Sequence, residues 1–493
     1  MLTPIDFGQL AFLFILHLRM NQFFRSIVKK TSQSSFIFLS CLLLQTVPDC
    51  ALAQAKLWIT KADQSALLME KVLNISQAQP LNDIPIIKVD SSQTFQTIDG
   101  FGFTLTGGSA ELIHQLPSQE RSALLNELFG KSPSSIGISC IRISLGASDL
   151  SSRVFSYDDI PVNKTDMALS QFSLSDDTLH LIPLLKEILG IQPNLFIMAS
   201  PWSAPAWMKT NKNSRGGKLD PQYYDVYARY MFRYIQEMEK HGIEIDALTL
   251  QNEPHHGGNN PSMVMEPADQ ALLVKQYLGP IFKTHQLTTR IIIWDHNCDE
   301  PQYPIAVLND KEAYPFIDGT AFHLYGGDIK AMSKVKQVFP DKQLYFTEQW
   351  TGSKGEFAGD LLWHIRNVVI GSMNNWSRMA LEWNLANDPG FGPHTPGGCT
   401  ECKGALTIDG SHVKRNVAYY IIAHASKAIP SGSIRIASTE IKEITHAAFK
   451  RPDGKIVLIL LNDGKSQQRF NIQVGKQWFE MQMQPGEVAT LLL

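Results

Sequence analysis

The chain has 493 residues, of which 44% are hydrophobic and 18% are charged. These proportions are typical of a globular protein, and the length is sufficient for two domains. The formal net charge of -3 gives no electrostatic basis for binding nucleic acid or an anionic membrane surface, so a neutral partner is expected.

Residues 1 to 53 are predicted to be a signal peptide with an upstream extension. Basic residues precede an apolar run at 36 to 44, and Ala51-Leu52-Ala53 has the A-x-A form of a cleavage site. The run is shorter than the roughly 20 residues of a membrane-spanning helix. We therefore expect a secreted or periplasmic protein, cleaved near Ala53 and without a stable membrane span, whose translation starts at Met1 or Met20.

The next segment, residues 54 to 95, contains short alternating runs such as IIKVD, which predict β-strands. Residues 431 to 493 have the same character, with KIVLILLND, FNIQV and a turn at Pro452-Asp453-Gly454. Because these segments flank the rest of the chain on both sides, we expect them to pack together as one small β-sandwich.

Between them, residues 96 to 430 show eight short apolar runs that alternate with amphipathic stretches. This alternation is typical of repeated βα units and predicts an α/β fold, a closed (β/α)8 barrel. The runs are QTIDGFGFTL, GISCIRISLG, NLFIMASPW, IDALTLQNE, RIIIWDHN, DGTAFHLYG, QLYFTEQW and RMALEWNLA.

The cysteine pattern favours one disulfide, formed in an oxidising compartment. Cys399 and Cys402 form a CxxC motif, but no second pair of ligands at similar spacing completes a tetrahedral zinc site, so a loop disulfide is favoured over zinc. Cys140 stands in the middle of a predicted strand and is expected to be buried. A lipoprotein anchor at Cys41 is the alternative to a simple secretory signal.

Catalytic groups of such barrels come from the C-terminal ends of the strands. The fourth and seventh strands end in carboxylates, Glu253 and Glu348. Two carboxylates that project into one barrel mouth fit glycoside hydrolysis, in which one protonates the leaving oxygen while the other attacks the anomeric carbon or activates water. The strand ends carry Arg142, Asp149, Trp202, Asn252, Glu253, Asp295, His296, His323, Tyr325, Glu348, Trp383 and Asn384.

The sequence lacks the motifs of dinucleotide binding, serine hydrolases and metal sites. The glycines at 100 and 102 do not continue into G-x-G-x-x-G because residue 105 is Leu, and no G-x-S-x-G occurs. His255 and His256 have no carboxylate partner at metal-binding spacing. No metal and no organic cofactor is expected.

Several motifs together resemble glycoside hydrolase family 30, which includes glucosylceramidase-like and endo-β-1,6-glucanase-like members. The resemblance implies that Glu253 is the general acid and base and Glu348 the nucleophile of a retaining double displacement. It covers the barrel and the tail through QTIDGFGFTLTGGSA, ASPWSAPAWMKTN, QNEP, FTEQWTGS, EWNLANDPGFGPH and RNVAYYIIAHASKAIPSG.

The resemblance also implies roles for the surrounding residues. Asn252 would hydrogen-bond the sugar 2-hydroxyl, and Arg142 and Tyr325 would hydrogen-bond Glu348 and keep it ionised, with His323 as a further supporting residue. Core aromatics, or a structural ion pair for Arg142, are the plainer alternatives. The substrate-binding residues would be Asp149, Trp202, Asn252, Tyr325 and Trp383.

The loops PHTPGGCTECKGALTIDG and HLYGGD resemble those of the β-1,6-glucanase-type members. The expected partner is therefore a β-glucoside, as an oligosaccharide, polysaccharide or glycolipid, with β-1,6-glucan favoured. The alternatives are glucosylceramide and a non-catalytic carbohydrate-binding barrel. For an enzyme, we expect the charge of Glu348 to hold Glu253 protonated at rest.

Overall fold

The computed structural model describes residues 54–76, 79–80, 83–161 and 163–493. The predicted signal segment lies outside the described residues. None of the described helices has the length and apolar character of a membrane span.

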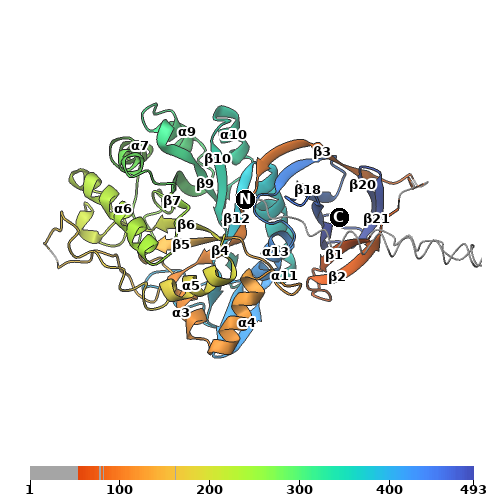
Figure 1. Ribbon diagram of the computed structural model, residues 1–493, viewed down its shortest axis with the longest axis horizontal. Coiled ribbons are helices and arrows are strands. Elements are labelled where there is room, and N and C mark those ends of the chain that lie inside the picture. The colour runs from red at the N-terminus through yellow and green to blue at the C-terminus, as the bar shows by residue number, and fades with distance from the viewer. Residues whose placement is uncertain (1–53, 77–78, 81–82, 162) are drawn as a thin grey trace, which may run out of the picture. The chain divides into compact units, whose positions relative to one another are not determined.

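Eight parallel strands close into a barrel, and each of the eight predicted runs overlaps one of them (Figure 1). Closure occurs where the last strand pairs with the first, with Ala380 opposite Phe101. The strands are β4 (Gly100–Leu105), β5 (Cys140–Leu145), β6 (Phe196–Pro201), β7 (Ala247–Thr249), β8 (Arg290–Cys298), β9 (Ile317–Gly327), β10 (Gln343–Glu348) and β12 (Ser377–Glu382).

The strands are buried on both faces, which explains their nearly continuous apolar sequences. Every residue of β4, β5 and β6 is buried. Cys140 is a free, buried cysteine that packs inside the barrel with Met198 and Tyr345, as predicted. The filled interior leaves the loops at the ends of the barrel as the places where a ligand could bind.

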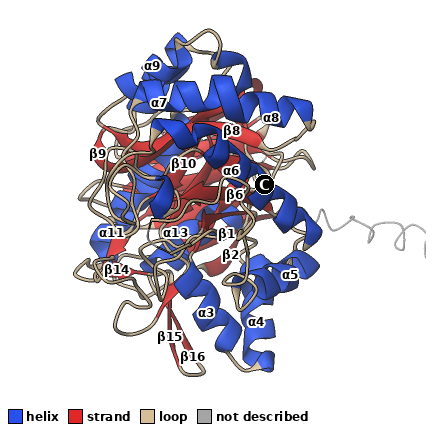
Figure 2. Ribbon diagram, turned by 90° about the vertical axis from the view of Figure 1, so that its left-hand side faces the viewer, coloured by secondary structure: helices blue, strands red, loops and turns tan. Residues whose placement is uncertain are grey.

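Helices follow the strands and surround the barrel (Figure 2). They are α3 (Gly107–Gln115), α4 (Ser118–Phe129), α5 (Leu181–Ile191), η1 (Ala206–Met208), η2 (Pro221–Tyr223), α6 (Tyr224–Lys240), α7 (Pro267–Leu272), η3 (Leu273–Leu278), α8 (Gly279–Thr284), α9 (Gln302–Leu308), η4 (Tyr314–Phe316), α10 (Ala331–Val338), α11 (Phe357–His364), η5 (Ile365–Gly371), α12 (Ser372–Asn374) and α13 (Val417–Ser426).

The long helix α6 shows how local sequence sets the ends of these elements. The short helix η2 leads into α6: Asp220 accepts a hydrogen bond from the backbone of Gln222, and Pro221 is the first residue of η2. Tyrosines at helical spacing, including Tyr227 and Tyr234, are fully buried in the apolar core. Just beyond the end of the helix, Gly242 has φ +79°, the left-handed conformation that glycine adopts most readily.

The second domain is built from both ends of the chain, as predicted. Strand β1 pairs with β22, and β3 lies between β17 and β20. Strand β3 continues to Thr97 and β4 begins at Gly100, so the sandwich passes into the barrel between these residues. The strands are β1 (Gln54–Thr60), β2 (Met69–Asn74), β3 (Ile86–Thr97), β17 (Ile434–Ser438), β18 (Ile444–Lys450), β19 (Ile456–Asn462), β20 (Gln468–Val474), β21 (Gln477–Met483) and β22 (Val488–Leu492).

The loops after the last two barrel strands carry small sheets of their own. Strand β11 (Thr351–Gly352) pairs with β14 (Cys402–Lys403), and β13 (Ala386–Asn387) pairs with the hairpin of β15 (Leu406–Asp409) and β16 (His412–Arg415). The predicted disulfide joins Cys399 to Cys402. These pairings tie the long segment after β12 to the mouth of the barrel.

Candidate active site

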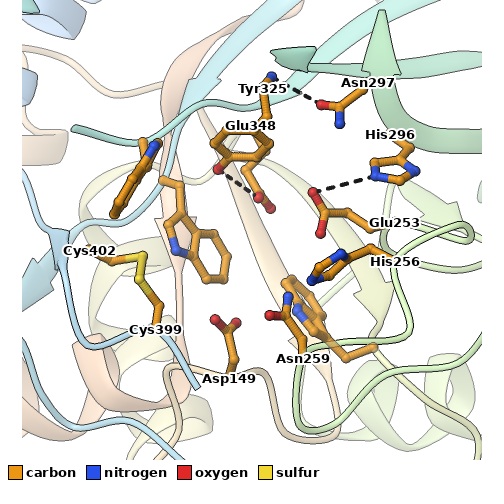
Figure 3. A pocket seen from close by; sticks show the side chains of 13 residues that line it. Asp149, Glu253, His256, Asn259, His296, Asn297, Tyr325, Glu348, Cys399 and Cys402 are labelled. Atoms are coloured by element: carbon orange, nitrogen blue, oxygen red, sulfur yellow. Dashed lines mark hydrogen bonds and ion pairs between the residues drawn. A yellow bond between two sulfur atoms is a disulfide. The ribbon is translucent and has the colours of Figure 1, made fainter. Parts of the chain in front are cut away.

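The C-terminal ends of the barrel strands surround a cavity of about 310 Å³ (Figure 3). Six of the nine predicted site residues line it. The other three, Arg142, Asn252 and His323, are buried and hydrogen-bonded within the same group. The lining residues are Asp149, Trp202, Glu253, His256, Asn259, His296, Asn297, Tyr325, Glu348, Trp350, Trp383, Cys399 and Cys402.

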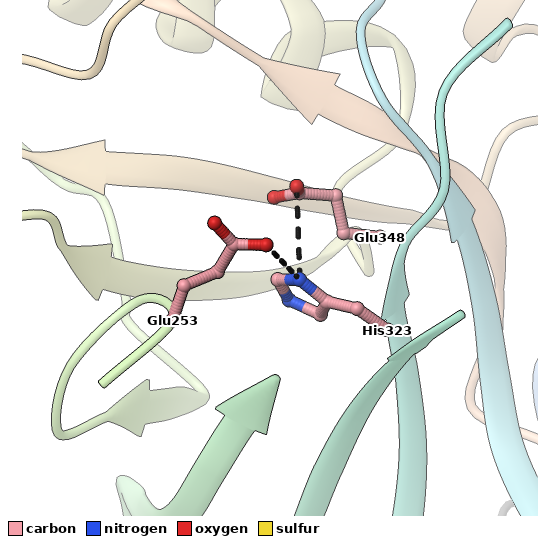
Figure 4. A group of neighbouring side chains, drawn as sticks. All are labelled: Glu253, His323 and Glu348. Atoms are coloured by element: carbon pink, nitrogen blue, oxygen red, sulfur yellow. Dashed lines mark hydrogen bonds and ion pairs between the residues drawn. The ribbon is translucent and has the colours of Figure 1, made fainter. Parts of the chain in front are cut away.

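The two predicted catalytic carboxylates converge on the ring of His323 (Figure 4). One carboxylate oxygen of Glu253, one of Glu348 and a ring nitrogen of His323 all lie within 4.8 Å of one another. This separation agrees with the roughly 5 Å of retaining glycosidases and is too short for the water molecule that an inverting pair accommodates at roughly 6.5 to 9.5 Å.

Arg142 extends from the middle of β5 and has no exposed surface. Its guanidinium donates to Oε2 of Glu348 at 2.5 Å, to Oδ1 of Asn252 at 2.6 Å and to Oδ2 of Asp295 at 2.8 Å. Its Cζ lies 4.7 Å from the centre of the Trp202 ring. Because a buried cation must be paired to be stable, these contacts fix Arg142 and, through it, the orientation of Glu348.

His323 and Tyr325 are two residues apart on β9, so both side chains leave the strand on the same face. The Tyr325 hydroxyl donates to Oε1 of Glu348 at 3.0 Å. In the His323 ring, Nδ1 lies 3.2 Å from Oε1 of Glu253, and Nε2 lies 3.2 Å from Oδ1 of Asp295. The predicted hydrogen bonds from Arg142 and Tyr325 to Glu348 are therefore both present.

Aromatic side chains form one wall of the cavity. Trp202 follows β6 and Trp383 follows β12, and their rings stack with centroids 5.5 Å apart. Asp149, in the loop after β5, contributes a carboxyl group that is only 5% exposed. Flat apolar rings beside isolated polar groups suit the apolar faces and the hydroxyls of a sugar ring.

The sequence matches the models of both domains of glycosyl hydrolase family 30, the TIM-barrel domain over residues 98–429 and the β-sandwich domain over residues 432–491. The chain belongs to glycosyl hydrolase family 30. As a member of this family, it is a glycoside hydrolase.

Individual relatives agree with this assignment. The chain is 34% identical to endo-1,6-β-D-glucanase neg1 of Aspergillus fumigatus over 76% of its own length and 80% of that protein. It is 27% identical to the mouse lysosomal acid glucosylceramidase, over 80% of each. A solved endo-β1,6-glucanase superposes with a TM-score of 0.83 at 32% identity, over 89% of this chain and 99% of that one.

In this family 30 enzyme, Glu253 and two residues of β8 have left-handed backbone conformations that are uncommon outside glycine. They are Glu253 with φ +46°, Trp294 with φ +70° and Asp295 with φ +66°. The amide of Glu253 donates to the carbonyl of Asp295 at 3.0 Å, which joins the ends of β7 and β8. Such conformations persist where the surroundings hold them in place, and they concentrate at functional sites.

Asp295 is a strand-end residue for which the sequence suggested no role, yet it lies at the centre of the site. Burial opposes its ionisation, but Arg142 and His323, together with a hydrogen bond from Thr347, hold the pKa of its carboxyl far below the ordinary value. Asp295 is therefore a permanent anion that pairs with Arg142 and orients His323. Its position directly after a β-type run is the only sequence signal that could have identified it.

The expected protonation of Glu253 needs correction. Burial raises its pKa, but the hydrogen bond and charge of His323, with His296 and His256, outweigh burial and lower the pKa below the ordinary value. Burial, together with the charges of Glu253 and Asp295, raises the pKa of Glu348 above its ordinary value, although His323 and Arg142 lower it. The charge of Glu348 therefore does not hold a proton on Glu253 in the free site.

The proton resides instead on His323. Burial lowers the pKa of this ring, but Glu348, Asp295 and Glu253 raise it to about 9. An imidazolium at this position donates to Glu253 through Nδ1 and to Asp295 through Nε2. The proton needed by a general acid is thus stored one hydrogen bond away from Glu253.

Within the described residues, Glu253, His323 and Glu348 are the one group whose donor atoms are close enough to hold a metal ion. These atoms already contact other charged groups of the site. His323 contacts both glutamates, and the Arg142 guanidinium contacts Glu348. A protonated His323 would also repel a further cation. The arrangement suits proton transfer between His323 and Glu253 rather than metal binding.

Several lining residues were not among the predicted site residues. His256 and Asn259 follow the acid motif, His296 and Asn297 end β8, and Trp350 stands two residues after Glu348. Two of them could have been predicted from the sequence. His296 is near a strand end, and Trp350, two residues after Glu348, is expected to point to the same side as Glu348. The disulfide was predicted, but nothing in the sequence placed it at the cavity.

Proposed function

We propose that this enzyme hydrolyses β-1,6-glucan or a related β-glucoside with retention of configuration. The observation that carries the proposal is the convergence of Glu253 and Glu348 oxygens within 4.8 Å at the mouth of the barrel. The substrate class is supported by the glucanase relatives, which are more similar to this chain than the mouse glucosylceramidase is.

In the first step, the carboxylate of Glu348 attacks the anomeric carbon while Glu253 donates a proton to the glycosidic oxygen, which leaves as an alcohol. Transfer of the Nδ1 proton of His323 to Glu253 prepares that acid and leaves a neutral imidazole, with its remaining proton on Nε2 toward Asp295. The product is a covalent glycosyl ester of Glu348.

In the second step, Glu253 accepts a proton from a water molecule, whose oxygen attacks the anomeric carbon and releases Glu348. The sugar leaves in the β configuration. Arg142 and Tyr325 stabilise the departing carboxylate through the bonds that they already make to it.

The remaining predicted residues would hold the glucosyl unit at the reacting position. Asn252 is held by Arg142 with its amide beside the catalytic pair, as recognition of a 2-hydroxyl requires. Asp149 would accept hydrogen bonds from other hydroxyls, and Trp202 and Trp383 would pack against the ring.

The test compares purified enzyme on β-1,6-glucan, glucosylceramide and an aryl β-glucoside, with the anomer of the first product followed by NMR. We expect the β anomer, and the highest kcat/KM on β-1,6-glucan. Glu348→Gln should lose about 10³-fold or more in kcat, because no covalent ester can form.

The matched control is Glu356→Gln, which alters an exposed glutamate in the loop after the same strand and should leave kcat unchanged. A preference for glucosylceramide would overturn the proposed substrate. Binding of glucan without hydrolysis of any β-glucoside would favour the carbohydrate-binding barrel.

A further inference from the structure

The Cys399–Cys402 disulfide closes a small ring at the edge of the cavity, and both cysteines line it (Figure 3). Cys402 is only 5% exposed and packs with Leu150, Trp202 and Trp383. The disulfide therefore contacts the aromatic wall of the proposed glucosyl site.

The segment that leads into this ring contacts the backbone of Asp149 and lies beside its carboxyl group. The amide of Thr395 donates to the carbonyl of Asp149 at 2.9 Å. Burial raises the pKa of the Asp149 carboxyl group to about 7, while the backbone amide of Cys399, which lies beside this group, lowers that pKa. Gly398 lies so close that a Cβ atom there would be 2.3 Å from the Asp149 carbonyl oxygen.

The other side of the ring is anchored to the barrel. The side-chain amide of Asn387 donates to the carbonyl of Cys402, and its oxygen accepts from the amide of Gly404 at 2.7 Å. Lys403 pairs with Thr351 in the short sheet that follows the strand of Glu348. The disulfide is thus a covalent cross-link, in addition to the backbone through residues 400 and 401, between the anchored strand and the amide that lies beside the Asp149 carboxyl group.

We propose that the Cys399–Cys402 disulfide positions Asp149 for the hydroxyls of the substrate, so that the oxidised ring is required for substrate affinity rather than for the chemical step. The inference rests on the proposed function, in which Asp149 binds the glucosyl unit. Reduction by a dithiol delivers two electrons and two protons to the bond, giving two cysteine thiols and an oxidised reagent. Cys399 is then tied to the anchored strand only through the backbone of residues 400 and 401, so its amide is held less firmly beside Asp149.

The test measures kcat and KM on an aryl β-glucoside for the wild type and for the Cys399→Ser/Cys402→Ser double variant. We expect KM to rise about tenfold, as loss of an ordered hydrogen bond predicts, with kcat within about twofold. Dithiothreitol should reproduce the rise in the wild type, leave the double variant unchanged, and be reversed by reoxidation. The reductant experiment uses folded wild type, so the result does not depend on folding of the variant.

A glycine pair gives a matched test that leaves the disulfide intact. Gly398→Ala should raise KM because its methyl group displaces Asp149, whereas Gly190→Ala, in open space on α5, should not change KM. An unchanged KM in the reduced enzyme, or a fall in kcat alone, would overturn the inference while leaving the proposed function intact. Absence of hydrolysis by the wild type would instead refute the proposed function.

Discussion

At the scale of single residues, the electrostatics of the site are set by an excess of carboxylates over cationic side chains. The side chain of Arg142 contacts Glu348 and Asp295, while the His323 ring contacts Glu253 and Asp295 and lies 3.7 Å from Glu348. Three carboxylates thus share one guanidinium and one imidazole. The arrangement keeps Asp295 ionised and leaves the mobile proton between the two catalytic groups.

The raised pKa of His323 makes part of the stability pH-dependent. The folded-state value, about 9, lies above the ordinary value of about 6.5, so the stabilisation is complete below pH 6.5 and is lost as pH rises through 9. In urea unfolding, the free energy of unfolding of the wild type should exceed that of His323→Gln at pH 6. This difference should decline by on the order of 3 kcal/mol between pH 6 and pH 9.5. His412→Gln, at an exposed position, should show no such decline. A difference that is constant with pH would contradict a protonated His323.

At the scale of elements, α13 joins the barrel to the sandwich. Nearly all of its residues are buried, and His424 reaches both terminal strands of the second domain. Its Nδ1 lies 2.9 Å from Oγ1 of Thr490, and its Nε2 lies 2.8 Å from Oγ1 of Thr60. Because the Thr490 hydroxyl donates to the carbonyl of His424, it accepts from Nδ1–H, and Thr60 donates to Nε2.

Thr490→Val should therefore destabilise the protein, since it leaves a buried N–H and a buried carbonyl of His424 without partners. We expect a loss of about 1–3 kcal/mol in the free energy of unfolding, measured by urea titration. Burial lowers the pKa of His424 to about 3, so the loss should be the same at pH 6 and pH 8. Thr288→Val, on an exposed loop, is the control. A loss no larger than that of the control would show that this contact does not join the domains.

At the scale of the whole described chain, one face of the sandwich sheet packs in the same apolar core as the barrel, and the other face packs in a second core inside the sandwich. In β19, Val457, Ile459 and Leu461 pack into the barrel-side core, while Leu458 and Leu460 pack inside the sandwich. This alternation makes the strand apolar on both faces. Because each face of the sheet covers a different core, separating the sheet from the barrel would expose the apolar residues on its barrel-side face to water.

Calorimetry of residues 54–493 should therefore show a single transition with equal calorimetric and van't Hoff enthalpies. A ligand of the barrel cavity should raise the temperature of that transition as a whole. Two transitions, of which only one responds to the ligand, would mean that the domains unfold independently.

Local sequence determined the barrel strands, the contribution of both ends to the sandwich, and the positions of Glu253 and Glu348. Strand periodicity and chain order are properties of neighbouring residues, and a strand end in a (β/α)8 barrel has a known location. The disulfide could also be predicted, because the CxxC motif had no second pair of ligands in the sequence to complete a zinc site.

The tertiary structure alone decided where the proton resides and what surrounds the substrate. The pKa of Glu253 depends on His323, which is 70 positions away in sequence and 3.2 Å away in space. The contact between the disulfide loop and Asp149 likewise joins segments about 250 residues apart. Electrostatic interactions and hydrogen bonds depend on distances between side chains, and those distances exist only once the barrel has closed.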